Sequence, residues 1–261
     1  MNPPPITMTV AIETRDLTRV FGDLYAVDHL DLEVEAGCFY GFLGPNGAGK
    51  STTIKMLTGL LAPSHGSLTV LGRDMTHPEQ GLDVKRRIGV VPENLHLFDN
   101  LTAREFLTFI GRMYLLPSDT VRERCEELLG MMQLADTDKK LTLEFSQGMK
   151  KKLALAAALL PNPELLFLDE PFEGVDAVSS RVLRQVLKRC VERGATIFLT
   201  SHVLEIVEKL CTHVGIISAG KLVHQGSMES LRRGGTLEDR FIELLGRDAT
   251  PGEPLSWLKE S

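Results

Sequence analysis

The sequence lacks both long apolar segments and paired cysteines. No stretch approaches the ~18 consecutive apolar residues of a membrane-spanning helix, and the best run, Leu153 to Leu160, ends at Pro161. The N-terminus lacks the basic segment and apolar core of a secretory signal. The cysteines form no C-x-x-C pair, which favours buried thiols in a reducing compartment: Cys38, Cys125, Cys190 and Cys211. We therefore expect a cytosolic protein, for which a partner would supply any membrane span.

An excess of positive charge is also missing. The chain holds 29 Lys and Arg against 35 Asp and Glu, a formal net charge of −6, so no nucleic acid is expected as a partner. With 43% apolar and 25% charged residues, the composition is that of a globular protein and argues against disorder. A length of 261 residues suffices for one large domain or two small ones without a metal or disulfide staple.

Apolar periodicity predicts a sheet that is partly antiparallel and partly parallel. From Val10 to Glu35 apolar and polar residues alternate, as in antiparallel strands with one buried face. Phe39 to Leu43 predicts a buried strand that runs into a glycine-rich loop, and Lys50 to Leu60 predicts a helix. Four further apolar runs predict strands, and helical patterns separate the last three, which indicates a parallel α/β sheet: Ile88 to Val91, Leu165 to Leu168, Ala195 to Leu199 and Val214 to Ile217.

The stretch from about 101 to 160 shows no strand pattern. Thr102 and Glu105 form a capping box before an apolar helix, Phe106 to Leu116. A second amphipathic helix follows from Asp119 to Met132. We therefore expect an all-helical insertion between two strands of the sheet.

The two ends of the chain differ from its centre. Three consecutive prolines predict a flexible tail over residues 1–9. A hairpin is expected from Val214 to Gln225, with its turn at Ala219-Gly220, and a short helix from Leu237 to Leu245. The tail 246–261 is loop-like, and its Trp257 is interpreted as a packing anchor rather than a ligand contact.

Gly44 to Ser51 reads GPNGAGKS and fits G-x-x-x-x-G-K-[ST]. A chance match in a chain this long is on the order of one in a hundred. The preceding strand and following helix make a glycine-rich turn without a ligand the weaker alternative. Glycines let backbone N–H groups face phosphate oxygens, and the helix points its positive end at the same anion. Lys50 would reach the β- and γ-phosphates, and the Ser51 hydroxyl would bind Mg²⁺.

Two carboxylates follow the apolar run Leu165 to Leu168. A buried strand would deliver Asp169 and Glu170 to the carboxyl edge of a parallel sheet, beside the phosphate loop. There Asp169 would hold Mg²⁺ and Glu170 could polarise an attacking water. Without the phosphate loop, a surface Asp-Glu pair would be the better interpretation.

Two further features are ambiguous when taken alone. Ser146 suits an N-cap before three lysines, Lys150 to Lys152, and cations in the first turn oppose the helix dipole. Either an anion from another molecule meets that helix end, or the lysines are a solvated charge run. His202 follows a predicted strand and would lie at the same edge as Asp169, where contact with a γ-phosphate is favoured over a structural role.

In this order, GPNGAGKST, FSQGM, LLFLDEP and the histidine after the next strand resemble the ATP-binding subunits of ABC transporters. The resemblance covers about residues 10–245, and four motifs in order make it very specific. FSQGM and the later LEDRFIELL look most like the ABC-2 type branch, whose members mostly export drugs, lipids, polysaccharides or ions. The implied fold is α/β: a P-loop NTPase core with a mostly parallel sheet, an N-terminal antiparallel β subdomain and an all-helical insertion at about 95–160. Residues 10–245 would be the ABC ATPase domain.

The resemblance also implies ATP and Mg²⁺ as cofactors, and a set of site residues. Glu170 matches the family's catalytic base and His202 its γ-phosphate sensor, and Lys50 completes the implied catalytic residues. Ser51, Asp169 and Glu93 are the implied metal site. The family's signature motif contacts a nucleotide held by the opposite subunit, and Gly174-Val175-Asp176 matches the loop that couples the two sites. Phe21 falls on the aromatic residue that stacks on adenine in the family; without the resemblance it would be interpreted as a core residue. The other implied nucleotide-binding residues are Gly44, Pro45, Asn46, Gly47, Ala48, Gly49, Lys50, Ser51, Thr52, Ser146, Gln147, Gly148 and Met149.

The sequence departs from the family pattern at two places. Glu93 stands where the family usually has Gln, and it brings a full negative charge near the phosphates, which puts its metal role in doubt. The usual signature L-S-G-G-Q is here Phe145 to Met149, in which Ser146 and Gly148 are retained. The substitutions Gln147 and Met149 weaken or reshape the expected contact.

The function implied by the resemblance is that of an ATP-hydrolysing transporter motor at the cytoplasmic face of a membrane. Its partners would be integral-membrane permease subunits, and it would act as a homodimer or as a heterodimer with a related ATP-binding subunit. The expected docking surface is Leu95 to Leu116, marked by Leu95, Leu97 and Phe98, with internal packing of these residues as the alternative. Two alternative functions remain. A non-transport ATPase of the same superfamily usually has two motif sets or a long coiled-coil insertion, and this sequence has neither. A P-loop kinase of small molecules would need an acceptor site and a lid, and would not explain FSQGM. The transported substrate is left open.

Overall fold

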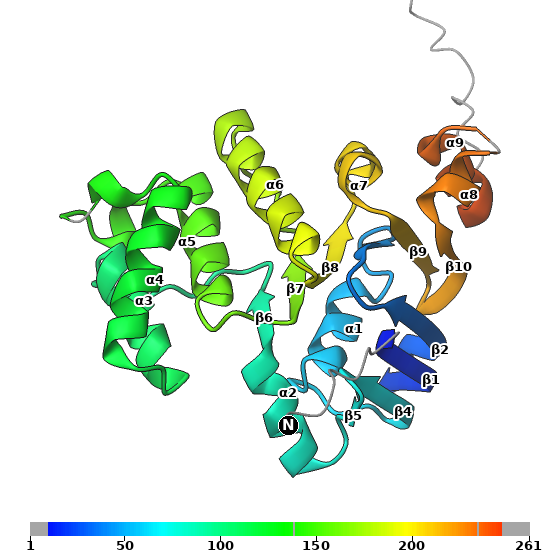
Figure 1. Ribbon diagram of the computed structural model, residues 1–261. Coiled ribbons are helices and arrows are strands. Elements are labelled where there is room, and N and C mark those ends of the chain that lie inside the picture. Colours follow the sequence, from blue (N-terminus) through cyan, green and yellow to red (C-terminus); the bar gives the residue numbers. More distant parts are fainter. Residues whose placement is uncertain (1–9, 138, 234, 247–261) are drawn as a thin grey trace, which may run out of the picture.

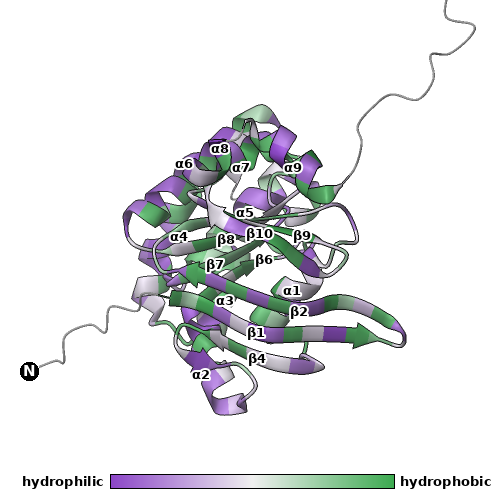
Figure 2. Cartoon of the chain, turned by 90° about the vertical axis from the view of Figure 1, so that its right-hand side faces the viewer, coloured by the Kyte–Doolittle hydropathy of each residue, from purple (hydrophilic) through white to green (hydrophobic). Residues whose placement is uncertain are grey.

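The computed structural model describes residues 10–137, 139–233 and 235–246, which form two sheets with helices around them (Figure 1). The smaller sheet is antiparallel and has the strand order β2-β1-β4-β5. Its strands are β1 Val10–Phe21, β2 Leu24–Glu35, β4 His65–Val70 and β5 Arg73–Asp74. Hydrophobic and hydrophilic residues alternate along β1 and β2 (Figure 2), as the sequence pattern predicted.

The larger sheet has the order β10-β9-β3-β8-β7-β6. All its neighbouring strands are parallel except β10, which pairs antiparallel with β9 as the predicted hairpin. Its strands are β3 Phe39–Leu43, β6 Ile88–Val91, β7 Leu165–Asp169, β8 Thr196–Ser201, β9 His213–Ser218 and β10 Lys221–Ser227. The predicted α/β class with a mostly parallel sheet is confirmed.

Six helices accompany the two sheets within the described residues: α1 Lys50–Leu57, α2 Pro78–Arg87, α6 Ala177–Glu192, α7 Leu204–Leu210, α8 Met228–Arg232 and α9 Leu237–Leu245. The helix predicted over Lys50 to Leu60 ends early, because Gly59 adopts a left-handed φ of 68°. Between residues 61 and 87 the sequence pattern was too weak to predict β4, β5 or α2.

The stretch predicted to be helical holds three α-helices: α3 Ala103–Met113, α4 Ser118–Met131 and α5 Gln147–Leu159. They lie together on one side of the molecule, beside α6 (Figure 1), and α5 packs directly against β6. The capping box that begins α3 is formed as predicted, with the Glu105 N–H donating to Thr102 Oγ1 at 3.3 Å and the Thr102 N–H donating to Glu105 Oε2 at 2.8 Å.

Removing this cap should destabilise the protein measurably. We expect Thr102→Ala to lower the free energy of unfolding by about 1 kcal/mol, because the Glu105 N–H loses its acceptor at the helix start. Urea unfolding followed by circular dichroism measures the change, with Thr102→Ser as the control that keeps the hydroxyl. A Thr102→Ala midpoint equal to that of the wild type would contradict a stabilising cap.

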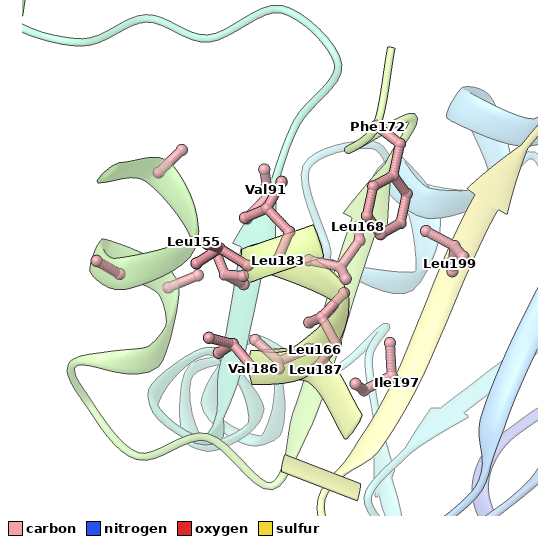
Figure 3. Packing of buried hydrophobic residues seen from close by; sticks show 14 of the residues in the cluster. Val91, Leu155, Leu166, Leu168, Phe172, Leu183, Val186, Leu187, Ile197 and Leu199 are labelled. Atoms are coloured by element: carbon pink, nitrogen blue, oxygen red, sulfur yellow. The ribbon is translucent and has the colours of Figure 1, made fainter. Parts of the chain in front are cut away.

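The hydrophobic core has two parts, one on each face of the larger sheet. In β7, Leu166 and Leu168 pack on the helical side, whereas Leu165 and Phe167 pack toward the antiparallel sheet. Figure 3 shows the helical side, where Leu166 and Leu168 meet residues of α5 and α6 such as Leu155, Leu183 and Val186. Because both faces are covered, the strands read as continuous apolar runs, which made them predictable.

Several expectations about the whole chain can also be placed. The four cysteines are free thiols, three of them buried and Cys190 half-buried. None of the helices within the described residues is long and apolar enough to cross a bilayer. The flexible tail predicted over residues 1–9 and the role of Trp257 lie outside the described residues.

Candidate functional site

The carboxyl ends of β3, β7 and β8 lie side by side at one edge of the larger sheet. The loop Gly44 to Thr52 leaves β3 there, Asp169 and Glu170 stand at the end of β7, and His202 follows β8. We term this the P-loop edge. The topology therefore brings together the three chain segments that the motifs singled out.

The phosphate loop is shaped by close contacts to two other strands. A side chain at Gly49, which has a φ of 109°, would place its Cβ 2.4 Å from the Ala26 carbonyl oxygen of β2. At Gly44 a Cβ would lie 2.4 Å from the Ile217 oxygen of β9. Glycine is therefore required at both positions, and the loop is fixed against β2 and β9.

Lys50 lies at the start of α1 with its ammonium group buried inside this loop. Its Nζ donates to the Gly44 oxygen at 2.8 Å and to the Pro45 oxygen at 3.3 Å. The same Nζ lies 3.7 Å from Glu170 Oε1. The lysine is thus held in place by the loop and offers a fixed positive charge at the P-loop edge.

Glu170 is the centre of a small polar cluster. Its Oε2 accepts a hydrogen bond from the His202 N–H at 3.3 Å and lies 3.1 Å from His202 Nδ1. Its Oε1 is buried and has no hydrogen-bond partner among the described residues. A carboxylate oxygen that is desolvated yet unbonded is available to accept a proton from a substrate molecule.

Glu170 is also held in an unusual backbone conformation. Its φ of 46° lies in the left-handed region, which costs a non-glycine residue of order 1 kcal/mol or more. The Glu170 N–H donates to Thr200 Oγ1 at 3.1 Å, and the Thr200 hydroxyl donates to Asp169 Oδ1 at 2.5 Å. The fully buried Thr200 thus positions the Asp169 carboxylate directly and Glu170 through its backbone. No local pattern marks this residue, because the contact depends on the pairing of β7 with β8.

We expect Thr200→Val to slow turnover by about tenfold, the equivalent of 1.4 kcal/mol in the barrier. Valine has nearly the same shape but leaves the Glu170 N–H and one Asp169 oxygen without a partner, so both carboxylates lose their orientation. Steady-state ATPase assays should show a fall in kcat with little change in KM. Thr200→Ser keeps the hydroxyl and serves as the control; equal kcat values for the two variants would argue against this positioning role.

A cleft of about 540 Å³ opens above the P-loop edge, a volume typical of small-molecule sites. Lys50, Ser51, Glu93, Glu170 and His202 line it. So do two exposed aromatic side chains at the tip of the antiparallel sheet, Phe21 at 46% and Tyr25 at 53% exposure. Phe21 carries the Arg19 guanidinium 4.5 Å from its ring centre. Phe21 is therefore not a core residue. Tyr25 is a second aromatic residue in the cleft lining, and the sequence analysis did not identify it.

The segment Ser146 to Met149 is part of a different surface. Ser146 and Gln147 are exposed, and none of the four residues lines the cleft. Ser146 caps α5, since the Met149 N–H donates to its Oγ at 3.3 Å. A Cβ at Gly148 would lie 2.6 Å from Asp176 Oδ2. The structure thus packs the signature segment against the segment Gly174 to Asp176, away from the phosphate loop of its own chain.

The lysine run after the signature segment is not a solvated charge run, and the interpretation as such is wrong for two of its members. Lys151 and Lys152 are buried. Lys151 Nζ donates to the Glu170 oxygen at 3.0 Å and to the Glu93 oxygen at 3.2 Å. Burial lowers the pKa of Lys151, and neighbouring carboxylates oppose that shift. Lys151 thus connects α5, the end of β7 and the loop after β6 through hydrogen bonds to two backbone oxygens.

The loop after β6 differs from the expectation for its apolar residues. Leu95 and Leu97 are half-buried and pack against the core cluster on the helical side of the larger sheet. Of the three predicted docking residues only Phe98 is largely exposed, at 47%. Its ring makes an edge contact with Phe109 of α3, with ring centres 5.1 Å apart.

The donor set of the P-loop edge fits a nucleoside triphosphate with a magnesium ion. Lys50 and the amino end of α1 offer positive charge for phosphate groups. Ser51, Asp169 and Glu93 offer the oxygen atoms that Mg²⁺ prefers. The described residues contain no cluster of three or more His, Cys, Asp or Glu side chains that could hold a metal.

The chain is similar to known proteins in both sequence and fold. A family model described as ABC transporter matches residues 27–173. The bacitracin transport ATP-binding protein BcrA of Bacillus licheniformis is 40% identical over 227 residues, 87% of this chain and 72% of that protein. Nod factor export ATP-binding protein I of Cupriavidus metallidurans is 37% identical over 86% of this chain and 73% of its own. A solved ATP binding subunit of an ABC transporter superposes with a TM-score of 0.83 at 29% identity, covering 90% of this chain and 99% of the other.

Proposed function

The chain belongs to the ABC transporter family. We propose that it is the ATP-hydrolysing motor subunit of an exporter of the ABC-2 type branch, and that it works as follows. Residues 10–245 form the ATPase in this proposal, with about 95–160 as the insertion that meets membrane partners. The observation that carries it is the convergence of Lys50, Asp169, Glu170 and His202 at one sheet edge, with Glu170 Oε1 buried and unbonded.

Hydrolysis follows from the charges at this edge. A water oxygen attacks the γ-phosphorus, the bond from that phosphorus to the β–γ bridging oxygen breaks, and ADP and phosphate leave. Glu170 orients the water and accepts its proton at Oε1, the oxygen that has no hydrogen-bond partner among the described residues. Lys50 stabilises charge on the phosphate oxygens, as positioned cations do in phosphoryl transfer. His202, hydrogen-bonded to the other Glu170 oxygen, senses the γ-phosphate.

Ser51 and Asp169 are the residues that would hold Mg²⁺, with Glu93 as a further oxygen donor in the cleft wall. When bound, the ion would supply positive charge that neutralises the terminal phosphates. Thr200 then has a second task, since its hydrogen bond to Asp169 Oδ1 leaves the other carboxylate oxygen for the metal shell.

The adenine ring is proposed to stack on Phe21, on the face that Arg19 leaves open. Stacking of a base on an aromatic ring is worth about 1–3 kcal/mol, so Phe21→Ala should weaken ATP binding by roughly tenfold or more. Equilibrium dialysis of ATP measures this, with Tyr25→Ala as the matched variant from the same cleft. A larger loss for Tyr25→Ala than for Phe21→Ala would move the adenine to Tyr25.

A complete site requires two copies of the cassette. Ser146 and Gly148 do not line the cleft of their own chain, yet an exposed helix start whose capping hydroxyl can still donate its proton is suited to contact phosphate. We therefore place ATP between the phosphate loop of one subunit and the signature segment of another, in a homodimer or a dimer with a related ATP-binding subunit. Asp176, packed on Gly148, would transmit the state of one site to the other.

Membrane subunits are proposed to dock on α3 and the loop before it, at the cytoplasmic face of the membrane. Phe98, Phe109 and Met113 expose apolar surface there, and such surface marks interaction sites. Leu95 and Leu97 are not the main part of this surface, because they are half-buried and pack against the core.

The test is co-purification. Tagged Glu170→Gln is isolated from its native cells in mild detergent with ATP and Mg²⁺, and partners are identified by mass. An integral-membrane protein that is lost when Phe98 and Phe109 are both changed to Ser supports the proposal. Recovery of soluble partners only would point to a non-transport ATPase of the superfamily. Transfer of phosphate to an acceptor, instead of release to water, would point to a kinase.

A further inference from the structure

A second cavity, of about 590 Å³, opens at the edge of the larger sheet opposite the P-loop edge. It lies where the chain enters β3, β7 and β8, at Ala36, Glu164 and Thr196. Residues of α4 and the carboxyl-terminal ends of α5 and α6 complete its wall. We term it the distal cavity. Nothing in the proposed function uses it.

The distal cavity carries an excess of positive charge. Arg124 of α4, Arg189 of α6 and Arg193, which follows α6, line it. None of the three forms an ion pair with another described residue. The Arg124 guanidinium donates to the Leu160 oxygen at 2.7 Å, which fixes its place at the end of α5.

The negative groups of the lining do not cancel this charge. The Glu164 carboxylate is already paired with Arg87, with its two oxygens 2.7 and 2.9 Å from Arg87 Nε and Nη2. Glu127 of α4 is the other carboxylate of the lining, and it has no ion-pair partner among the described residues. Three guanidinium groups against one available carboxylate favour an anionic ligand.

Much of the remaining wall is apolar. Leu128, Leu159 and Val186 contribute side chains from three different helices. Met131 exposes 37% of its surface at the same place, although it is a large apolar residue. A mainly apolar concavity with a few charged groups is the usual form of a small-molecule site.

We propose that the distal cavity binds an amphipathic organic anion, an apolar chain with one carboxylate or phosphate, and that its occupancy is coupled to nucleotide at the P-loop edge. The head group would meet Arg189 and Arg193, and the chain would cover Met131 and Leu128. This assigns a ligand class to a site that the ATPase reaction itself does not need.

The coupling follows from the elements that end at the cavity. The carboxyl end of α5 lines it, and the amino end of α5 is capped by Ser146. Strand β7 begins there and ends at Asp169. Helix α6 ends there and is capped at its other end by Asp176. Three elements thus connect the cavity to the residues proposed to bind and sense ATP. Linkage makes the proposed coupling reciprocal, so each ligand changes the affinity for the other by the same factor. This part rests on the proposed function.

The thiol of Cys190 provides a direct test, because it lines the cavity while the other three cysteines are buried. Burial raises the pKa of Cys190, so labelling with a maleimide is run at alkaline pH. We expect laurate to slow labelling saturably, and dodecyltrimethylammonium, which has the same chain and the opposite charge, to give no protection. Cys190→Ser should abolish the signal and identify its source.

Arginine variants decide whether charge recognition is responsible. The double variant Arg189→Gln, Arg193→Gln should weaken laurate protection by roughly tenfold or more, since bonds to charged groups are lost. Arg181→Gln, on the same helix but outside the cavity, is the matched control. Equal protection by laurate and by the cation, absence of protection by laurate, or an unchanged response in the double variant would each overturn the proposed site.

The coupling is read from the same labelling signal with Mg-ATP present. We expect the apparent dissociation constant of laurate to change about fivefold or more in the wild type and to stay constant in Lys50→Ala. Bound ATP with an unchanged laurate constant would overturn the coupling. Failure of the wild type to bind ATP would overturn the proposed function and leave the laurate result intact.

Discussion

Glu170→Gln should reduce ATP hydrolysis by about 10²–10⁴-fold, the contribution typical of a general base, while ATP binding is retained. The amide has the size of the carboxylate but cannot accept a proton from water. Its neutral group also removes a negative charge from beside the phosphates. The γ-phosphate should then persist between two subunits, and a dimer should accumulate. Phosphate release and light scattering in the presence of Mg-ATP measure the two effects.

Glu173→Gln is the matched control, since Glu173 lines the same cleft but is exposed. It should hydrolyse ATP at nearly the wild-type rate. Wild-type turnover in Glu170→Gln would remove Glu170 from the role of base. If turnover falls as expected but no dimer accumulates, Glu170 is still supported as the general base, whereas binding of ATP between two subunits is contradicted.

Lys50→Ala should reduce the rate of ATP hydrolysis about as strongly as Glu170→Gln, but for a different reason. The Lys50 ammonium is fixed by the Gly44 and Pro45 oxygens and is the buried cation beside Glu170. Removing one positioned charge from a desolvated site costs about 10²–10³-fold in kcat. Here we also expect ATP affinity to fall, because the phosphates lose their partner and Glu170 repels them. Isothermal titration with ATP and a phosphate-release assay check both.

Lys55→Ala provides the comparison for this variant, because Lys55 is exposed on the same helix α1. It should leave binding and turnover unchanged. Thermal unfolding of Lys50→Ala separates loss of function from loss of fold, since Glu170 then stays buried without its cation. ATP affinity equal to that of the wild type would contradict the role given to Lys50.

Much of the fold was predictable, because each strand of the larger sheet is covered on both faces and its apolar run stands out. The capping box of α3 and the cap at Ser146 were predictable for a similar reason, since both depend on residues within one turn. Other local signals misled. The Lys150 to Lys152 run looked solvated, yet Lys151 is buried where three segments meet. Leu95 and Leu97 looked available for docking, yet they pack inward.

The sequence by itself determined the chemistry of this protein: a phosphate loop whose glycines permit its path, two carboxylates at the end of a buried strand, and the order of motifs that identifies the family. Such features are encoded in short stretches, where residue type and spacing decide local geometry. Which distant groups meet depends on tertiary packing: Thr200 lies beside Asp169 and Glu170, and the arginines of α4 and α6 surround the distal cavity. These contacts depend on strand pairing and helix packing between segments far apart in the chain, which no local pattern contains.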